Sequence, residues 1–409
     1  MGAHSTQGFA MSTVSARAAL VFSALGHSFA HLFEPIFYIV ALVLPAELGL
    51  PYEDVLMLVV AGKLLYGLAA PLAGWLGDRW STLGMMAVYF VGLGLSAIAT
   101  GLAHGPLQLG LALGCLGLFG SIYHPVGIAW LVRNAVNRGQ ALGINGVFGG
   151  LGPALAGVIA GLLVESFGWR AAFIAPGVGV LATAAAFVWM TRRGALVEVK
   201  ADRKAEPAAS RGDTWRAGVV LTITMLCGGL IYQATQAALP KLFEQRLGDD
   251  VGVLGVAGGV TTVYLIAGLT QILSGHLADR FPLKWVYVGC YLAQIPLLLL
   301  AATLSGLPLL AVAVMMVSFN MGGIPAENVL LARYSPPKWR GTAFGMKFIL
   351  SFGVSGLGVP LVSLILGATG SLTWLLLLLA ASAVVVVAAG WQLPSERPAA
   401  AQPQAAAAE

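Results

Sequence analysis

The first apolar segment of the chain carries ionisable and polar groups at helical spacing. Ser23, His27, His31, Glu34 and Tyr38 fall within a stripe of about 80° on a helix that turns ~100° per residue. A carboxylate beside imidazoles has the chemistry to take up and release a proton. Two histidines four residues apart, with a carboxylate three residues further on, also form a plausible metal-ligand set. We favour proton transfer and expect no bound metal, and the metal alternative stays open.

Lys63, in the next apolar segment, is the natural partner for Glu34. At ~1.5 Å per helical residue, Glu34 lies about 25 Å from Arg17 and Lys63 about 22 Å from Asp78, so their depths match. We expect an ion pair, because unpaired charges at this depth would be costly. The pair could be purely structural. The functional hypothesis is that Glu34 carries a coupling proton, and that Lys63 or His31 sets how readily it leaves.

The composition places these groups in a membrane. The chain has 409 residues, 58% hydrophobic and only 10% charged, with a mean hydropathy of +0.86, whereas soluble domains carry roughly 25% charged residues. Apolar stretches long enough to cross a bilayer, ~20 residues each, recur along its length. We expect an all-α membrane protein with 12 transmembrane helices, at 18–44, 54–76, 83–103, 107–131, 140–163, 170–191, 217–240, 253–276, 284–304, 308–332, 342–367 and 372–391.

Charge distribution gives the expected orientation. Twelve spans put both termini on one side, and basic residues favour cytoplasmic loops. With the termini in the cytoplasm, only Arg170, Lys241 and Arg246 lie outside, while Lys63 and Lys347 lie within spans. The net charge of +5 is spread over loops with no basic domain, so we expect no nucleic-acid partner.

The chain divides near its middle. A polar segment, 192–216, is expected to be a cytoplasmic linker between an N-terminal six-helix half, 1–191, and a C-terminal half, 217–392. The tail, 393–409, is rich in Ala, Pro and Gln and is expected to be disordered.

The two halves contain an internal repeat. Segment 74–79 reads Gly-Trp-Leu-Gly-Asp-Arg, and segment 275–280, which lies 201 residues later, reads Gly-His-Leu-Ala-Asp-Arg. Pro125 recurs as Pro325 at an offset of 200 residues. Because each half has six spans, the copies should have the same orientation, as parallel repeats about an axis along the membrane normal.

These motifs resemble the major facilitator superfamily over the whole chain. Its Gly-x-x-x-Asp-Arg loop signature is present in segments 74–79 and 275–280, although the basic cluster that follows is missing or reduced. Segment 149–157, with Gly152 and Pro153, resembles the Gly-Pro motif of antiporters in this superfamily. Residues 31–34, 44–45 and 123–127 resemble the fosmidomycin-resistance branch of efflux proteins. The resemblance implies a superfamily fold around a central cavity, in the cytoplasmic (inner) membrane of a bacterium.

In this superfamily the first, fourth, seventh and tenth spans line the cavity. The resemblance therefore implies that His27, His31, Glu34 and His124 converge; alternatively, His124 only stabilises the bend at Pro125. Four uncharged polar residues of the second half are further cavity candidates, with helix–helix hydrogen bonding as the alternative role. They are Tyr232, Gln233, Gln236 and Asn320.

Two groups of residues are candidates for gating. Glu327 and Lys347 both lie ~10 Å inside the cytoplasmic boundary by helical rise, so they form a candidate gate pair, which could equally be static. We assign conformational coupling to the repeated loop residues, whose alternative role is to cap helix ends; they are Asp78, Arg79, Asp279 and Arg280. Gly152 and Pro153 are expected to bend the span 140–163 and allow close packing.

The predicted function is proton-coupled export of a small molecule by rocking of the two halves. The alternatives are an importer or exchanger of a small organic anion or a metal ion, and a non-transporting sensor on the same scaffold. The expected partners are the substrate, protons and the bilayer. We expect a monomer with no cofactor, and not an enzyme, because the six histidines and the absence of Gly-x-Ser-x-Gly fit no intramembrane hydrolase or oxygenase.

Overall fold

The computed structural model describes residues 3–197, 211–248, 251–336 and 340–394. Within these ranges the secondary structure is entirely helical. The helices are α1 (Ala3–Ala30), α2 (Phe33–Val40), α3 (Leu44–Leu48), α4 (Tyr52–Met57), α5 (Val60–Leu68), α6 (Ala70–Arg79), α7 (Thr82–Gly101), α8 (Pro106–Gly120), α9 (Ile128–Asn134), α10 (Arg138–Phe167), α11 (Ala171–Arg192), α12 (Arg211–Arg246), α13 (Val253–Arg280), α14 (Leu283–Ala301), α15 (Gly306–Tyr334), α16 (Arg340–Phe348), α17 (Gly358–Thr369) and α18 (Thr373–Gly390). Short π or 3-10 segments interrupt them at η1 (Tyr123–Gly127), η3 (Ile349–Gly353) and η4 (Val354–Leu357).

The helices confirm a protein that spans a membrane. Ten helical stretches of the described chain are long and apolar enough to cross a bilayer, and an eleventh joins Tyr52–Leu68 to Ala70–Arg79 across a 42° bend. The first expected span, 18–44, does not meet the same criterion, because it is divided between α1 and α2 and carries polar groups at the division. The structure thus shows ten or eleven of the twelve expected spans.

A proline explains why the first expected span is divided. Pro35 has no N–H to donate to the carbonyl of His31, and it sits in the first turn of α2, where a missing donor is tolerated. Between the two helices the backbone forms 3-10 turns, with hydrogen bonds to the third preceding residue. His31 N donates to Ser28 O at 3.2 Å and Leu32 N to Phe29 O at 3.3 Å.

Irregular turns also divide two other expected spans. The span expected at 107–131 is α8, η1 and α9, and the one expected at 342–367 is α16, η3, η4 and α17. In η1 the irregular turn contains Pro125, which again cannot donate to the preceding turn. Helix-breaking segments inside a membrane persist where they are buried in protein or line a cavity.

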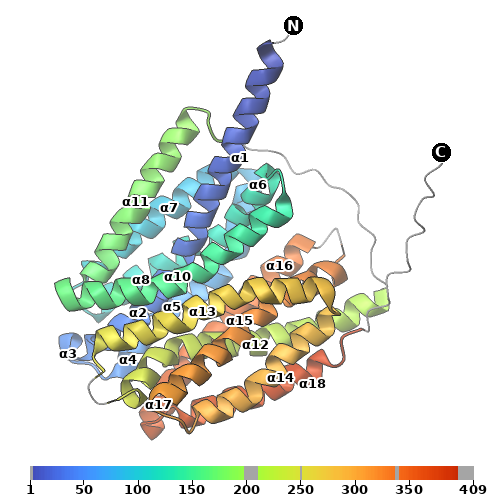
Figure 1. Ribbon diagram of the computed structural model, residues 1–409. Coiled ribbons are helices and arrows are strands. Elements are labelled where there is room, and N and C mark those ends of the chain that lie inside the picture. The colour runs from blue at the N-terminus through green and yellow to red at the C-terminus, as the bar shows by residue number, and fades with distance from the viewer. Residues whose placement is uncertain (1–2, 198–210, 249–250, 337–339, 395–409) are drawn as a thin grey trace.

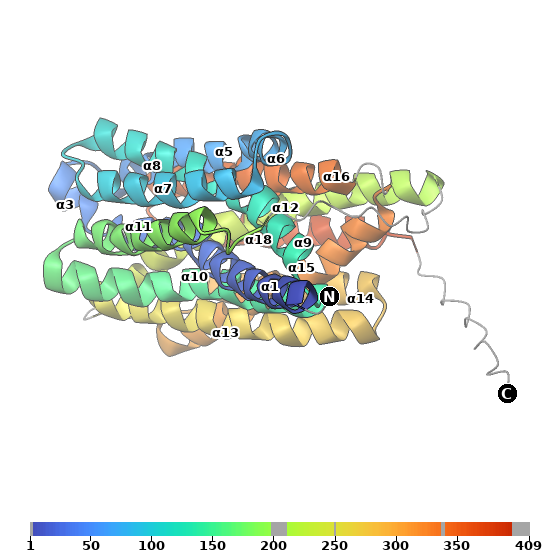
Figure 2. The same ribbon diagram turned by 90° about the horizontal axis from the view of Figure 1, so that it is seen from above.

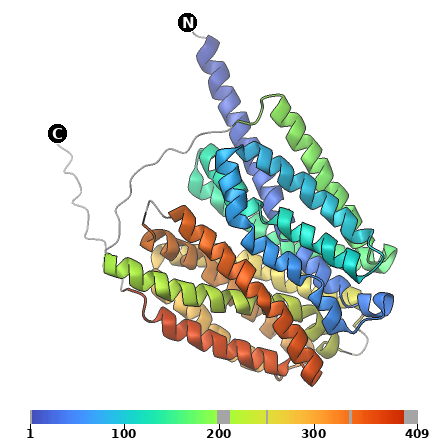
Figure 3. The same ribbon diagram turned by 180° about the vertical axis from the view of Figure 1, so that it is seen from behind.

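The elements of the first and second parts of the chain form two neighbouring bundles. Figures 1 and 3 show the blue-to-green helices α1–α11 gathered in one bundle and the helices α12–α18, yellow-green to red, in the other. The equivalent helices α6 and α13 end at Arg79 and Arg280, as the repeat requires. The proposed limits of the halves stay a prediction, and most of the linker, 198–210, and of the tail, 395–409, lies outside the described residues.

Glycines allow the two bundles to touch closely. In Figure 2, α10 runs beside α13, and a Cβ added to Gly150 would lie 3.1 Å from Cα of Gly268. A Cβ on Gly67 of α5 would overlap the backbone of Gly353 in η3. Small residues at such crossings permit the van der Waals contact on which helix association in a membrane depends.

Candidate functional site

A buried ion pair joins three helices near the division between α1 and α2. Lys63 of α5 donates from Nζ to Glu34 Oε1 at 2.5 Å and to Gln233 Oε1 of α12 at 2.7 Å. Tyr38 donates to the same Glu34 oxygen at 3.0 Å. The Lys63 side chain is only 4% exposed and that of Glu34 is 24% exposed. Because Gln233 belongs to the second bundle, this lysine links the two bundles.

Three histidines meet next to this pair. The ring centroids of His27 and His31 lie 5.2 Å apart, those of His27 and His124 5.2 Å apart, and those of His31 and His124 5.0 Å apart. One ring nitrogen from each histidine lies within 4.8 Å of the others. The expected convergence of His124 with the histidines of the first span is therefore present in the structure. Its function stays a prediction.

Aromatic rings from the second bundle cover the histidines. The imidazole of His124 stacks on Phe348 of α16 at 4.9 Å and on Phe352 of η3 at 5.6 Å between centroids. Phe352 also lies 6.0 Å from His31. The histidines come from the first bundle and their cover from the second, so the cluster lies between the two. Sequence reasoning missed both phenylalanines, because an apolar residue in an apolar span gives no signal of this role.

A hydrogen-bond network positions the segments that carry the histidines. Asn145 of α10 donates from Nδ2 to Tyr123 Oη at 2.7 Å and to Ser23 Oγ at 3.1 Å, and Tyr123 donates to Ser23 O at 2.6 Å. His27 Nδ1 is 2.7 Å from Asn145 O. The network ties α1, η1 and α10 together. Asn145 was missed in the sequence, although an amide in an otherwise small and apolar segment was a usable signal.

Gly152 allows α10 to approach α1 at the histidines. A Cβ at this position would lie 2.6 Å from Ser28 O and 2.9 Å from His31 Cβ. Pro153 follows it inside α10. The glycine of the antiporter-like motif thus packs directly against the segment that bears His31.

A second buried ion pair lies wholly in the second bundle. Lys347 Nζ is 2.7 Å from Glu327 Oε1, and each side chain is 8% exposed. Lys347 also donates to Asn328 Oδ1 at 2.6 Å, and Tyr287 donates to Glu327 Oε2 at 2.8 Å. The expected contact is present and well satisfied by hydrogen bonds. A role for this pair in gating stays a prediction.

The other cavity candidates of the second bundle differ in their contacts. Gln236 donates to Tyr232 Oη at 3.1 Å, a bond within α12. Asn320 is buried in α15, and its Nδ2 has no hydrogen-bond partner among the described residues. Of the four candidates, Gln233 accepts a hydrogen bond from Lys63 of the Glu34–Lys63 pair.

The loop residues of the repeat have surface contacts. Asp78 accepts from Arg133 Nη2 at 2.9 Å, with the Asp78 side chain 70% exposed. Its partner is thus Arg133 of α9. Asp279 and Arg280 are exposed at the end of α13. Whether these residues couple conformational change stays a prediction.

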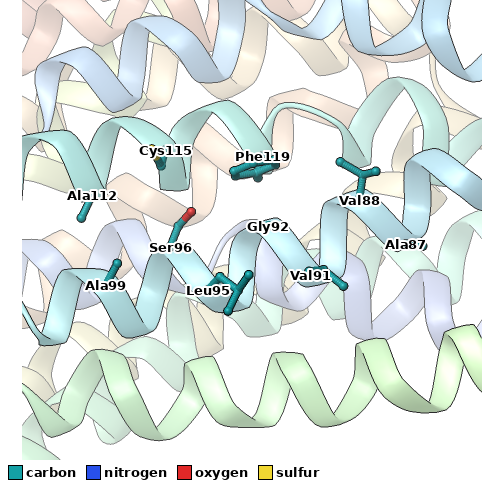
Figure 4. A pocket seen from close by; sticks show the side chains of 10 residues that line it. All are labelled: Ala87, Val88, Val91, Gly92, Leu95, Ser96, Ala99, Ala112, Cys115 and Phe119. Carbon is teal, nitrogen blue, oxygen red and sulfur yellow. The ribbon is translucent and has the colours of Figure 1, made fainter.

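A separate groove runs between α7 and α8 (Figure 4). Its lining is almost wholly apolar, with Ser96 and Cys115 as the exceptions. Exposed Val91 and Leu95 form part of it, so it lies on the outer face of the first bundle. An apolar groove in this position suits contact with lipid tails, and the ionisable groups lie elsewhere.

Comparison of the sequence with models of known protein families identifies the family of this chain. A model of the Major Facilitator Superfamily matches residues 18–261 and 250–409. The chain belongs to this superfamily. The match covers both bundles, so the fold and the repeat have a common explanation in a membrane transporter.

Relatives and solved structures within the superfamily agree with this assignment. An uncharacterised MFS-type transporter of Bacillus subtilis, YfnC, is 24% identical over 80% of this chain and 81% of its own length. The probable sulfoacetate transporter SauU of Cupriavidus necator is 24% identical over 77% of this chain and 79% of its own length. The puromycin resistance protein Pur8 of Streptomyces alboniger is 30% identical, but over 30% of this chain and only 25% of its own length. The crystal structure of a bacterial homologue of the human lysosomal transporter Spinster, inward-facing and occupied, matches with a TM-score of 0.71 at 14% identity over 93% of this chain and 96% of that one, which shows the shared fold.

Proposed function

We propose that this superfamily member is a proton-coupled exporter of a small molecule, which works by alternating access between two six-helix halves. Segment 18–44 is the first of twelve spans in this proposal, despite its division, and both termini lie in the cytoplasm of a bacterium. Transporters of this superfamily rock their halves about a site near the middle of the membrane. The resemblance to the fosmidomycin-resistance branch and the partial match to a puromycin resistance protein support export.

The observation that carries the proposal is the position of the Glu34–Lys63 pair between the bundles. Lys63 Nζ contacts Glu34 of the first bundle and Gln233 of the second at 2.5 and 2.7 Å. A proton on Glu34 removes the charge that holds Lys63, and Lys63 is then a buried cation without a counter-ion from that side chain. The stability of the contact between halves thus depends on the protonation of Glu34. Such a dependence is what couples a proton to a conformational change.

Import or exchange of a small organic anion is the second candidate. The specific support is the relative named a probable sulfoacetate transporter and the burial of Lys63 and Lys347 beside the histidines. Each lysine already holds a carboxylate, Glu34 or Glu327. An anion would have to displace one of them, so the geometry favours proton-coupled export.

The test is proton release from purified protein in weakly buffered detergent. Candidate compounds, with puromycin and sulfoacetate among the first, are added to the wild type, to Glu34→Gln and to a control, Glu165→Gln, at an exposed position of α10. The proposal expects a compound that releases protons from the wild type and the control but not from Glu34→Gln. A compound that binds wild type and Glu34→Gln equally tightly and releases no protons from either would refute coupling at Glu34, and would favour a uniporter or an anion exchanger.

A further inference from the structure

The three histidines provide nitrogen ligands from two segments that fold together. One ring nitrogen each from His27, His31 and His124 lies within 4.8 Å of the others. Tetrahedral coordination with bonds of ~2.0 to 2.1 Å requires the nitrogens to be about 3.3 Å apart. Side-chain rotations that move each nitrogen by about 1 Å would close this distance. The cluster is thus within about 1 Å per nitrogen of a three-nitrogen site.

Hydrogen bonding leaves a lone pair on His27 and both ring nitrogens of His124 without a partner among the described residues. His27 Nδ1 is 2.7 Å from the carbonyl oxygen of Asn145. A carbonyl only accepts hydrogen bonds, so Nδ1 carries the hydrogen and Nε2 carries the lone pair. Histidines that bind metals are commonly held in this way, through the second ring nitrogen and a backbone carbonyl. Both ring nitrogens of His124 are buried and have no partner among the described residues. Buried polar atoms without a hydrogen-bond partner are rare because they destabilise the fold, so this arrangement suggests that a ligand binds there.

The donor set selects the class of cation. Three imidazoles suit zinc, nickel, cobalt and copper, whereas calcium and magnesium prefer oxygen ligands. Among the described residues the site has three protein ligands, and His27 and His31 are partly exposed. Structural zinc sites are normally closed by four protein ligands, while three leave a position open for exchange. His27 lies in the last turn of α1, His31 at the break that follows it and His124 in η1. The ligands thus lie at or next to interruptions of helices, as in transporters whose binding sites are formed by discontinuous helices.

Nearby charges do not oppose a dication. The two lysines beside the cluster are each paired, Lys63 with Glu34 at 2.5 Å and Lys347 with Glu327 at 2.7 Å. Each pair has no net charge as long as its carboxylate is ionised. A proton on Glu34 would add one positive charge close to the site and disfavour the cation. The mutual exclusion of cation and proton is the behaviour expected of an antiporter.

We propose that His27, His31 and His124 bind a divalent transition-metal cation of the zinc, nickel and cobalt class as the transported substrate. This inference rests on the proposed transport function and names the substrate class of the same site. It changes the expectation of no metal, because His124 from a distant segment, rather than the carboxylate Glu34, completes the set.

The first test is binding of Co²⁺ to detergent-purified protein carrying no polyhistidine tag, measured by calorimetry and by the visible absorption of the cation. We expect one cation per chain, and affinity at least about tenfold weaker in His31→Asn and His124→Asn, since even the loss of an outer hydrogen bond to a ligand costs ~10- to 100-fold. The matched controls are His104→Asn and His276→Asn, at exposed histidines outside the cluster, which should bind like the wild type. Binding that is absent in the wild type, or unchanged in His124→Asn, would overturn the proposal.

The second test separates transport from mere binding. Proteoliposomes are loaded with a zinc-sensitive dye, and Zn²⁺ uptake is followed under an imposed pH gradient for the wild type, His31→Asn and Glu34→Gln. We expect uptake by the wild type alone. Binding at the cluster without uptake would overturn the substrate assignment. Zn²⁺ uptake that does not depend on the pH gradient would support the metal substrate and refute proton coupling. If the protein binds no metal but releases protons when an organic compound is added, the metal substrate is refuted and proton coupling is supported.

Discussion

Removal of Lys63 should destabilise the protein unless Glu34 is neutralised as well. Unit charges 2.5 Å apart attract by about 6 to 7 kcal/mol at an effective dielectric constant of ~20, and desolvation of both groups offsets part of this. Loss of one partner of a buried pair typically costs ~3 to 5 kcal/mol. Glu34 is 24% exposed and can recruit water, so Lys63→Met should lower the free energy of unfolding by about 3 kcal/mol.

The assay is a double-mutant cycle read from reversible unfolding in mixed detergent micelles. Adding Glu34→Gln to Lys63→Met removes the orphaned carboxylate and should recover most of the loss. The coupling energy should then be at least about 2 kcal/mol, because the loss in Glu34→Gln alone, which leaves Lys63 without its counter-ion, adds to it. The control is the exposed pair Arg170–Glu47, at 3.4 Å with side chains 36% and 48% exposed, whose cycle should give less than ~1 kcal/mol. A coupling energy for Glu34 and Lys63 no greater than that of the control pair would refute the argument that burial makes this contact strong.

Two further outcomes follow from the packing between and within the bundles. In Gly67→Val, the new side chain would overlap the backbone of Gly353, so transport in proteoliposomes should fall by at least tenfold with membrane insertion intact. The control Gly143→Ala, with open space around it, should transport normally. Equal transport by the two variants would show that the close crossing at Gly67 is not needed. Tyr287→Phe removes a 2.8 Å hydrogen bond to Glu327 and should lower the free energy of unfolding by about 1 kcal/mol in the same micelle assay; a larger loss, of the size seen for an ion pair, would mean that the buried pair depends on this hydroxyl.

The spans and the pairing of Glu34 with Lys63 were predictable because local rules govern them. A bilayer forces backbone groups to bond within each segment, so hydropathy alone reveals most spans. Matched depth along two adjacent helices then makes an ion pair the cheapest arrangement for two charges. Pro35 also indicated a missing backbone hydrogen bond in the first span. The sequence did not show that this would divide the span into two helices, α1 and α2.

Contacts between segments far apart in the sequence were harder to predict from the sequence. No partner of Asp78 was predicted from the sequence, and it pairs with Arg133, 55 residues away. Asn145 and Phe352 were not noticed, and they determine how the histidines are held and covered. Each of these contacts depends on the rotation of a helix about its own axis, and in segments that are apolar on every side no periodic pattern reports that rotation.

The sequence alone therefore determined that this is a helical membrane protein with two related halves and ionisable groups in the first span, because hydropathy, charge and repetition are properties of the chain itself. The family resemblance implied that His124 meets His27 and His31, and the tertiary structure established it. Only the tertiary structure decided that Lys63 reaches Gln233 of the other bundle. The physical reason is that coordination and coupling depend on distances of a few ångströms, and these are set by how glycine-rich helix faces pack rather than by any single segment.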